Sequence, residues 1–212
     1  MSGPAMVRPL GRVIAQLTAG DRDLERVVRL VGPLPDRSRP PGFAALLQIL
    51  CEQQLSVASA AAIWKRVAAA VEPLGPETFL ALPEERLRAL GLSRSKVIYG
   101  RALAEAVAAG RFDLDGLSAL DDEAAMAALT AIKGIGRWTA EIYLLFTLGR
   151  NDIWPADDLA LQAAMHHLKG LRQRPGRAEM VALAEGWRPH RGTAARLLWA
   201  YYRQIKGMPA GA

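Results

Sequence analysis

Two adjacent carboxylates, Asp157 and Asp158, follow a Trp-Pro pair and stand directly before an apolar helical run. A carboxylate can stabilise a positively charged transition state and direct a water molecule. Aspartate is also a preferred N-cap and suits the first turn of a helix, so the pair needs no catalytic role. The sequence leaves two hypotheses open here, one chemical and one structural.

One helix upstream, residues 129–140 predict a helix, a tight turn and a second helix. Gly134 and Gly136 flank Ile135, and glycine permits positive φ while leaving backbone N–H groups unobstructed. The turn could therefore lie against a phosphate, with the amides and dipole of the second helix favouring the same anion. The alternative is an ordinary helical corner in which glycine is a C-cap and nothing binds.

The overall composition favours a polyanionic partner. The 212 residues carry a net charge of +6, and 51% of them are hydrophobic, as in a folded protein. No apolar run is long enough to span a bilayer, and the first residues lack the pattern of a secretory signal. We therefore expect no membrane association and an intracellular location, either cytoplasmic at a bacterial or archaeal nucleoid or nuclear.

Cysteine usage excludes two kinds of site. Cys51 is the single cysteine, so neither an internal disulfide nor a four-cysteine iron–sulfur cluster can form. We expect no metal site.

The elements that must position these residues are all predicted to be helical. Apolar spacing and Gly or Pro punctuation predict roughly ten helices with short loops and no strand hairpins. The expected ranges are 21–31, 43 to about 53, 56–71, 76–82, 83–89, 95–109, 123–132, 137–148, 158–168, 178–186 and 189–206.

We expect three stretches of chain to build this fold. Residues 1–42 would pack with the C-terminal lobe, and residues 43–150 would form a central helical lobe ending in the hairpin. Residues 151–212 would form the C-terminal part that carries the acidic pair.

The hairpin with its flanking apolar and basic residues resembles the helix-hairpin-helix of DNA repair glycosylases. Residues 154–161 are similar to the catalytic segment of the alkyl-base type, 3-methyladenine DNA glycosylase II. In that family the catalytic Asp is followed by two residues and then a branched apolar one. Asp158 fits with Leu161 in the apolar place, so the resemblance implies that Asp158 is catalytic and Asp157 supports it. The DNA-binding residues that it implies at the hairpin are Lys133, Gly134, Ile135, Gly136, Arg137 and Thr139.

The resemblance also implies an aromatic pocket for a flipped base. Residues 187–199 resemble the C-terminal signature of alkyl-base glycosylases, in which the final Trp, here Trp199, lines the pocket. Trp138 and Ile142 would complete it, although a single Trp is more often a core residue. Relatives with lyase activity carry a catalytic Lys where this chain has Trp138, which implies a monofunctional enzyme. Ile142 and His190 replace aromatic residues found in relatives, which favours cationic bases that leave easily.

The front of the chain carries two further resemblances. Residues 49–58 look like the family segment whose residue in a helix break fills the gap left by the flipped nucleotide. That residue would be Gln54, with Leu55 adjacent, and the alternative is a polar kink in which Gln side chains satisfy loose backbone amides. Residues 91–96 resemble another family loop, in which Lys96 either touches phosphate or merely begins a solvated helix.

Together these features imply an all-α, two-lobed glycosylase with a cleft between the lobes and no N-terminal β domain. It would act as a monomer on double-stranded DNA and excise alkylated purines of the 3-methyladenine and 7-methylguanine type. No cofactor would be required, although the family resemblance allows a monovalent cation at the hairpin. Two alternatives stay open: a non-catalytic DNA-binding module, and a glycosylase for oxidised or deaminated bases.

Overall fold

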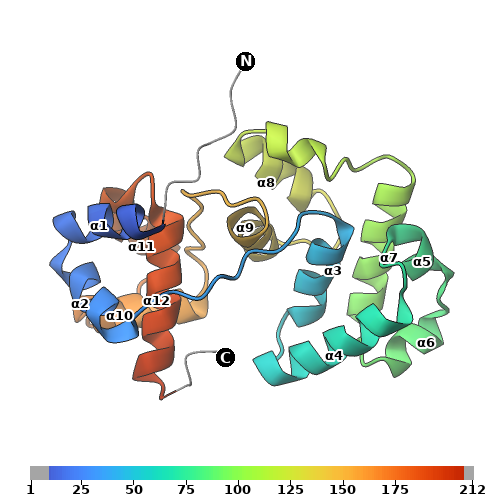
Figure 1. The fold of residues 1–212 in the computed structure, drawn as a ribbon, viewed down its shortest axis with the longest axis horizontal. Coiled ribbons are helices and arrows are strands. Elements are labelled where there is room, and N and C mark those ends of the chain that lie inside the picture. The colour runs from blue at the N-terminus through green and yellow to red at the C-terminus, as the bar shows by residue number, and fades with distance from the viewer. Residues whose placement is uncertain (1–9, 208–212) are drawn as a thin grey trace. The chain divides into compact units, whose positions relative to one another are not determined.

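The computed structural model describes residues 10–207, and every regular element in that range is a helix, which confirms the predicted all-α class (Figure 1). The described chain divides into two compact units, one formed by residues 10–36 and 151–207 and the other by residues 37–150. None of the described helices is long and apolar enough to cross a membrane.

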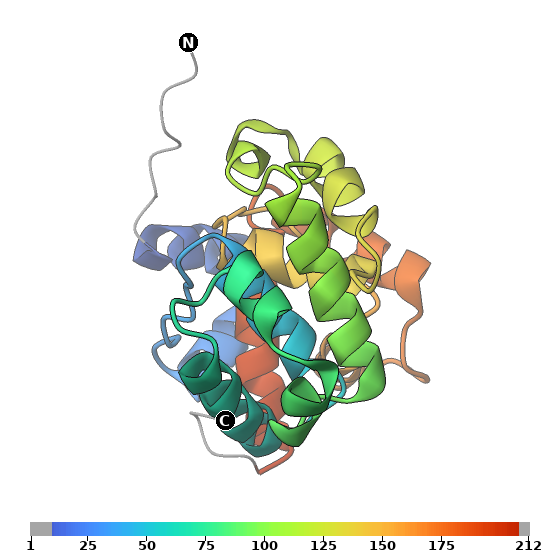
Figure 2. The ribbon, with the colours of Figure 1, turned by 90° about the vertical axis from the view of Figure 1, so that its right-hand side faces the viewer.

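In the unit of residues 37–150, several helices pack around one nearly apolar helix, α3 (Phe43–Glu52). Its elements are α3 (Phe43–Glu52), α4 (Val57–Ala70), α5 (Pro76–Ala81), α6 (Glu84–Ala89), α7 (Arg94–Ala108), the 3₁₀ helix η1 (Gly116–Ala119), α8 (Asp122–Thr130) and α9 (Arg137–Phe146). Helix α3 packs against α4, α7 and α9, while α5 and α7 lie side by side (Figure 2). Because neighbours cover several of its faces, α3 is buried at seven of its ten positions instead of along one stripe.

The other unit joins the two ends of the described chain. It contains α1 (Leu10–Gly20), α2 (Arg22–Val31), α10 (Leu159–Lys169), α11 (Arg177–Leu183), the 3₁₀ helix η2 (Glu185–Trp187) and α12 (Arg191–Ile205). Helix α12 packs against α1, α2 and α10, and its buried positions share one apolar core with theirs.

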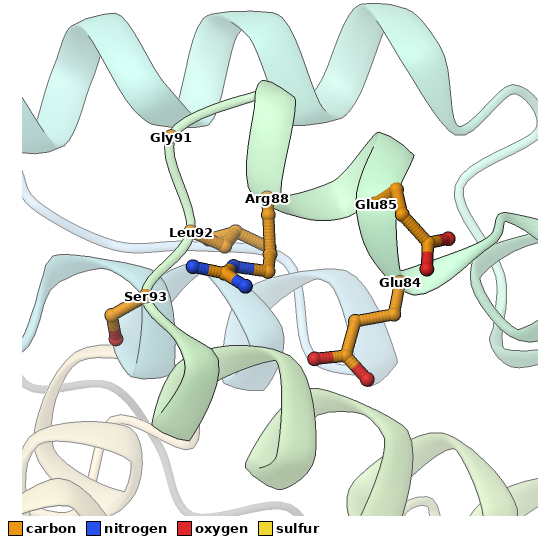
Figure 3. A pocket seen from close by; sticks show the side chains of 6 residues that line it. All are labelled: Glu84, Glu85, Arg88, Gly91, Leu92 and Ser93. Carbon is orange, nitrogen blue, oxygen red and sulfur yellow. The ribbon is translucent and has the colours of Figure 1, made fainter.

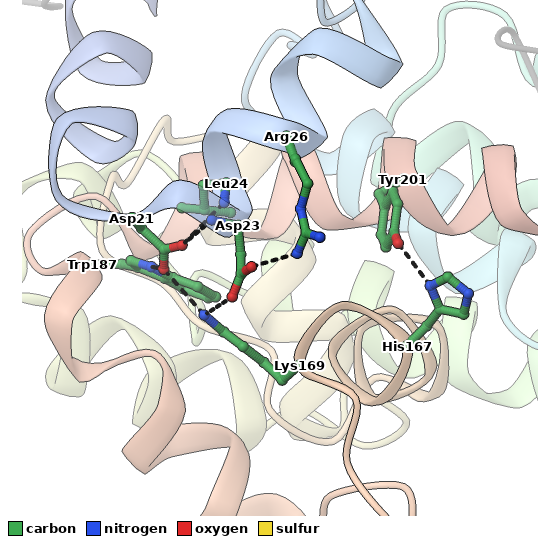
Figure 4. A network of polar contacts seen from close by, with 8 residues as sticks. All are labelled: Asp21, Asp23, Leu24, Arg26, His167, Lys169, Trp187 and Tyr201. Carbon is green, nitrogen blue, oxygen red and sulfur yellow. Dashed lines mark hydrogen bonds and ion pairs between the residues drawn. The ribbon is translucent and has the colours of Figure 1, made fainter.

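A polar network ties α2 to the C-terminal helices of the same unit (Figure 4). Asp21 caps α2 by accepting from the amides of Asp23 and Leu24, and its other oxygen accepts from Trp187 Nε1 at 2.9 Å. Lys169, at the end of α10, donates to both Asp21 and Asp23. One aspartate therefore serves as a helix cap and as the link between segments more than 140 residues apart in sequence.

The first boundary between the units lies earlier than the sequence suggested, between Asp36 and Arg37 instead of after residue 42. The reason is a set of contacts that bind residues 37–42 to the central helices. The amide of Arg39 donates to Phe146 O, its guanidinium pairs with Glu52 at 2.9 Å, and the amide of Gly42 donates to the hydroxyl of Tyr143. The second boundary falls between Arg150 and Asn151.

Two helix predictions need correction. No helix is predicted before Asp21, yet α1 begins at Leu10 and buries Val13 and Leu17 one turn apart. The last helix begins at Arg191, two residues later than expected, because Pro189 and His190 belong to the turn that precedes it. The remaining limits differ from expectation by a few residues, as helix ends commonly do.

Candidate functional site

Of the two glycines in the hairpin between α8 and α9, Gly134 is required by the backbone conformation and Gly136 is not. The turn is closed by a hydrogen bond from Ile135 N to Ile132 O at 3.0 Å, and Gly134 has φ +91°. A Cβ at Gly134 would overlap the ring of Tyr99 from α7. Nothing lies within 4 Å of the Cβ position at Gly136, the N-cap of α9. Conformation and space therefore require glycine at residue 134, whereas residue 136 leaves the start of α9 open to an approaching group.

The side chains of the hairpin divide into a buried plug and an exposed basic rim. Ile135 is 3% exposed, as expected of a plug between two helices, while Lys133 and Arg137 lie at the surface. Arg137 Nε donates to Glu141 Oε1 at 2.9 Å, and Glu141 is itself buried. The i,i+4 spacing of Arg137 and Glu141 is the sequence signal for this pair, in which a buried carboxylate holds the exposed guanidinium along α9.

Thr139, which the family resemblance places among the DNA-binding residues, has a buried side chain. It is 2% exposed, and its hydroxyl accepts a hydrogen bond from Gln53 Nε2 at 2.7 Å. Its backbone amide is the third of α9 and is one of the N–H groups at the helix start that can donate to an anion. The contact with Gln53 was missed because the two residues are 86 positions apart.

The break between α3 and α4 lies where the sequence predicted it. Gln54 has φ +55°, and both Gln54 and Leu55 are exposed. Ser56 caps α4 by accepting from the amide of Ser59. The pair expected to fill the gap left by a flipped nucleotide is thus presented on the surface of a short, sharply bent turn.

Lys96 has a role that the sequence did not suggest. Its Nζ donates to Cys51 O at 2.7 Å, near the end of α3, and burial lowers the pKa of Lys96. A phosphate contact by the same ammonium group stays a prediction. Burial also raises the pKa of the Cys51 thiol to about 12, so this cysteine is a neutral core residue.

In the other unit, the structure brings Asp158 and Trp199 together. Asp158 is the N-cap of α10, and its Oδ1 accepts from Leu161 N at 2.9 Å. The same oxygen accepts from the indole Nε1 of Trp199, on α12, at 3.1 Å. The carboxylate is half-buried, so two donors fix it while it retains access to the surface. Asp158 is therefore a helix cap, as the structural hypothesis predicted, and its carboxylate still reaches the surface.

The segment before Asp158 is held by contacts on both sides. Trp154 is buried, donates from Nε1 to Met180 O at 3.0 Å and meets Trp187 edge-on. Asp157 is exposed and pairs with Arg177 at the start of α11. Gln162 Nε2 donates to Ala156 O at 3.0 Å, which fixes the turn just before the acidic pair.

Ile142 and His190, the two positions where relatives carry aromatic residues, have different surroundings. Ile142 lies half-buried on α9, one turn after Trp138, whose side chain is 37% exposed. His190 is 8% exposed, and its Nε2 lies 3.1 Å from Gln16 Oε1 of α1. His190 is therefore packed among the helices of its own unit.

Two hollows open on the surface of the described residues. One is lined by Glu84, Glu85 and Arg88 of α6 and by Gly91, Leu92 and Ser93 of the loop before α7 (Figure 3). The other lies between the end of α1 and residues 186–190. Neither is lined by Asp158, Trp138 or Trp199. The lining of the first hollow carries two carboxylates and one guanidinium, and this excess of negative charge disfavours a phosphate there.

A metal centre built from side chains is not found between residues 10 and 207, where no group of three or more His, Cys, Asp or Glu could hold an ion. A monovalent cation at the hairpin would instead have main-chain carbonyl oxygens as ligands. Ile132 O and Gly134 O lie in this turn and accept hydrogen bonds from Ile135 N and Gln53 Nε2. A carbonyl oxygen has a second lone pair, so each of these two oxygens could accept one further contact.

An all-helical fold with a glycine hairpin and, one helix later, an aspartate that caps a helix is the arrangement expected of a helix-hairpin-helix DNA repair protein. Residues 47–189 match the family described as HhH-GPD superfamily base excision DNA repair protein, and the chain belongs to that family.

The similarity to known proteins extends over most of this chain. It is 33% identical over 202 residues to DNA-3-methyladenine glycosylase 1 of Schizosaccharomyces pombe, covering 92% of this chain and 88% of that protein. A structure of the Schizosaccharomyces pombe 3-methyladenine DNA glycosylase Mag1 in complex with abasic DNA superposes with a TM-score of 0.80 at 30% identity, covering 92% of this chain and 97% of that one. A DNA-3-methyladenine glycosidase from Bacillus halodurans gives a TM-score of 0.77 at 32% identity, covering 98% and 95% of the two chains.

Proposed function

We propose that this protein is a monofunctional DNA glycosylase that excises alkylated purines, of the 3-methyladenine and 7-methylguanine type, from double-stranded DNA. The observation that carries the proposal is the half-buried carboxylate of Asp158, fixed at a helix start by N–H donors from Leu161 and Trp199. Its family and the alkyl-base glycosylases that it resembles over most of its length support the same reaction.

The hairpin would hold the DNA backbone. Its exposed Gly136 opens the first amides of α9, and Lys133 and Arg137 add positive charge at the same surface. Mag1, similar along nearly its whole length, is described in complex with abasic DNA, which supports DNA as the partner.

The reaction breaks the bond between C1′ of the deoxyribose and the purine nitrogen. The electron pair of that bond leaves with the base, and a cationic alkylated purine departs as a neutral molecule. The sugar passes through an oxocarbenium-like state, whose positive charge the Asp158 carboxylate stabilises. Water then forms the new C1′–O bond and gives up a proton, for which the same carboxylate is the acceptor. Because the leaving base already carries positive charge, no strong general acid is needed.

Recognition of the base would rely on aromatic faces. Trp138 is exposed on α9 beside Ile142, and Trp199 extends from α12 to the carboxylate. An indole face attracts a cation, and stacking tolerates different bases, so a cationic purine is the favoured ligand. Trp138 has no amine, and no Schiff base can form at this position. The product would be an intact strand with an abasic site.

Replacing Asp158 with Asn tests the proposal, because Asn is as good an N-cap as Asp and preserves the start of α10. Base release from methylated duplex DNA should fall by about 10²-fold or more, while DNA binding survives. Asp121→Asn is a matched control, since Asp121 caps α8 through Ala124 N and lies at the surface.

The outcomes separate the proposal from its two alternatives. A wild-type protein that binds DNA but releases no base from any single-lesion duplex would be a binding module. Release of oxidised or deaminated bases without alkylated ones would move the enzyme to another substrate class. Strand cleavage after base release would contradict the monofunctional assignment.

A further inference from the structure

The turn between α3 and α4 contains a strained residue. Gln54 is the one residue other than glycine with positive φ in the part of the chain that the structure describes. A positive φ brings the Cβ of an L-residue too close to the following carbonyl oxygen, so this backbone conformation is unfavourable for any residue but glycine. Such conformations persist only where neighbouring contacts impose them, and they concentrate at functional sites. The contacts around Gln54 therefore identify the residues that hold the turn in this conformation.

The side chain of Gln53 attaches the turn to the hairpin. Its Nε2 donates to Thr139 Oγ1 at 2.7 Å and reaches Gly134 O at 3.4 Å. Gly134 lies in the hairpin turn and Thr139 in the first turn of α9, where it is buried. One carboxamide therefore contacts both parts of the surface that would bind phosphate.

The turn is also fixed at its two ends. Lys96 Nζ donates to Cys51 O at the end of α3, and Ser56 caps the start of α4. Between these anchors, Gln54 and Leu55 are exposed. Because both ends of the turn are held, the contact of Gln53 with Thr139 and Gly134 determines the position of the exposed Gln54 and Leu55 relative to the hairpin.

We infer that Gln53 is a positioning residue that holds the Gln54–Leu55 turn at a fixed spacing from the phosphate-binding hairpin, so that backbone binding and entry into the base stack occur together. The inference rests on the proposed function, in which this turn fills the gap left by the flipped nucleotide. Gln53 acts through Thr139 and Gly134 and contacts no base itself. A misplacement of about 1 Å can cost about 10²-fold in rate, so a single internal hydrogen bond can matter at this place.

Gln53→Met tests this role because it removes the amide and keeps the length of the side chain. Gln48→Met is the matched control: Gln48 lies on α3, just before the turn, and its Nε2 donates to Glu52 Oε1 at 2.9 Å. The probe is a duplex with a tetrahydrofuran abasic analogue opposite 2-aminopurine, whose fluorescence reports a side chain entering the stack. Binding of an undamaged duplex and thermal unfolding are measured in parallel.

Gln53→Met should bind the undamaged duplex as the wild type does but lose most of the fluorescence change at the abasic site. For base release, kcat should fall by about tenfold or more with KM nearly unchanged. Thr139→Val should reproduce both effects, and the double variant should be no worse than either single one, because the two groups form one contact.

Three results would overturn the inference: a Gln53→Met variant indistinguishable from Gln48→Met, additive effects of the Gln53 and Thr139 changes, or a wild-type protein that binds the abasic duplex with unchanged fluorescence. If the wild type releases no base, the proposed function fails. The fluorescence comparison still decides the role of Gln53, because it requires no turnover.

Discussion

The indole Nε1 of Trp199 donates a hydrogen bond to Oδ1 of Asp158 at 3.1 Å, and the same oxygen accepts from the amide of Leu161. The cap of α10 and the proposed catalytic carboxylate are therefore one group, held from its own helix and from α12. Two donors on one oxygen restrict the movement of the carboxylate, which preorganises it for a developing positive charge.

Trp199→Phe should separate the two roles that Trp199 could have. Phenylalanine keeps an aromatic face but cannot donate to Asp158. A hydrogen bond to a charged group contributes about 1.5–3 kcal/mol, so the loss should lower kcat for base release by roughly tenfold to 10²-fold. Single-turnover assays on a 7-methylguanine duplex measure this effect.

The combination with Asp158→Asn provides the control. If Trp199 acts through the carboxylate, Trp199→Phe should have little further effect in the Asp158→Asn background. Full additivity, or a Trp199→Phe variant with normal kcat, would leave Trp199 with a stacking role alone.

The two hairpin glycines should respond differently to alanine. Gly134→Ala places a Cβ at φ +91° and against Tyr99, so it should destabilise the fold by about 1–2 kcal/mol or more and weaken DNA binding as a consequence. At Gly136 the Cβ position is open, so Gly136→Ala should leave stability nearly unchanged. Thermal unfolding and binding to an undamaged duplex measure the two effects.

If the start of α9 lies against a phosphate, Gly136→Ala should weaken DNA binding without any loss of stability. A Gly136→Ala variant with normal stability and normal binding would contradict the phosphate contact at this residue.

The sequence predicted the local parts of this arrangement and missed the distant ones. The hairpin, the helix break at Gln54 and the cap at Asp158 depend on glycine, on punctuation and on helix-start chemistry within a few residues. The contact of Gln53 with Thr139 depends on α3 meeting α9, and that of Trp199 with Asp158 on α12 meeting α10. No local pattern encodes such pairings. Helix α1 did have a local signal, since Leu10, Val13 and Leu17 recur at helical spacing.

Trp138 should contribute binding through its exposed face. Base stacking on an aromatic side chain is worth about 1–3 kcal/mol, so Trp138→Ala should lower kcat/KM for base release by roughly fivefold to 10²-fold. Trp138→Phe should retain much of the activity, because a smaller aromatic face remains. Equal losses in both variants, or no loss in Trp138→Ala, would place Trp138 outside the base pocket.

The Asp21 network should make the unit of residues 10–36 and 151–207 sensitive to acid. Burial alone would raise the pKa of Asp21, but hydrogen bonds from Trp187 and Leu24 and the charge of Lys169 outweigh it, and the pKa lies below its ordinary value of 3.8. A carboxyl group with a lowered folded pKa stabilises the protein above its unfolded pKa, and this contribution is lost as the pH falls through the folded value. Asp21→Asn keeps the cap but removes the charge, so it should cost about 1–2 kcal/mol near neutral pH. The unfolding temperatures of the two proteins should converge as the pH falls through the lowered folded pKa of Asp21, below 3.8, because the wild-type carboxyl is then protonated as well. A difference that stays constant between neutral and acid pH would show that the charge of Asp21 contributes nothing to stability.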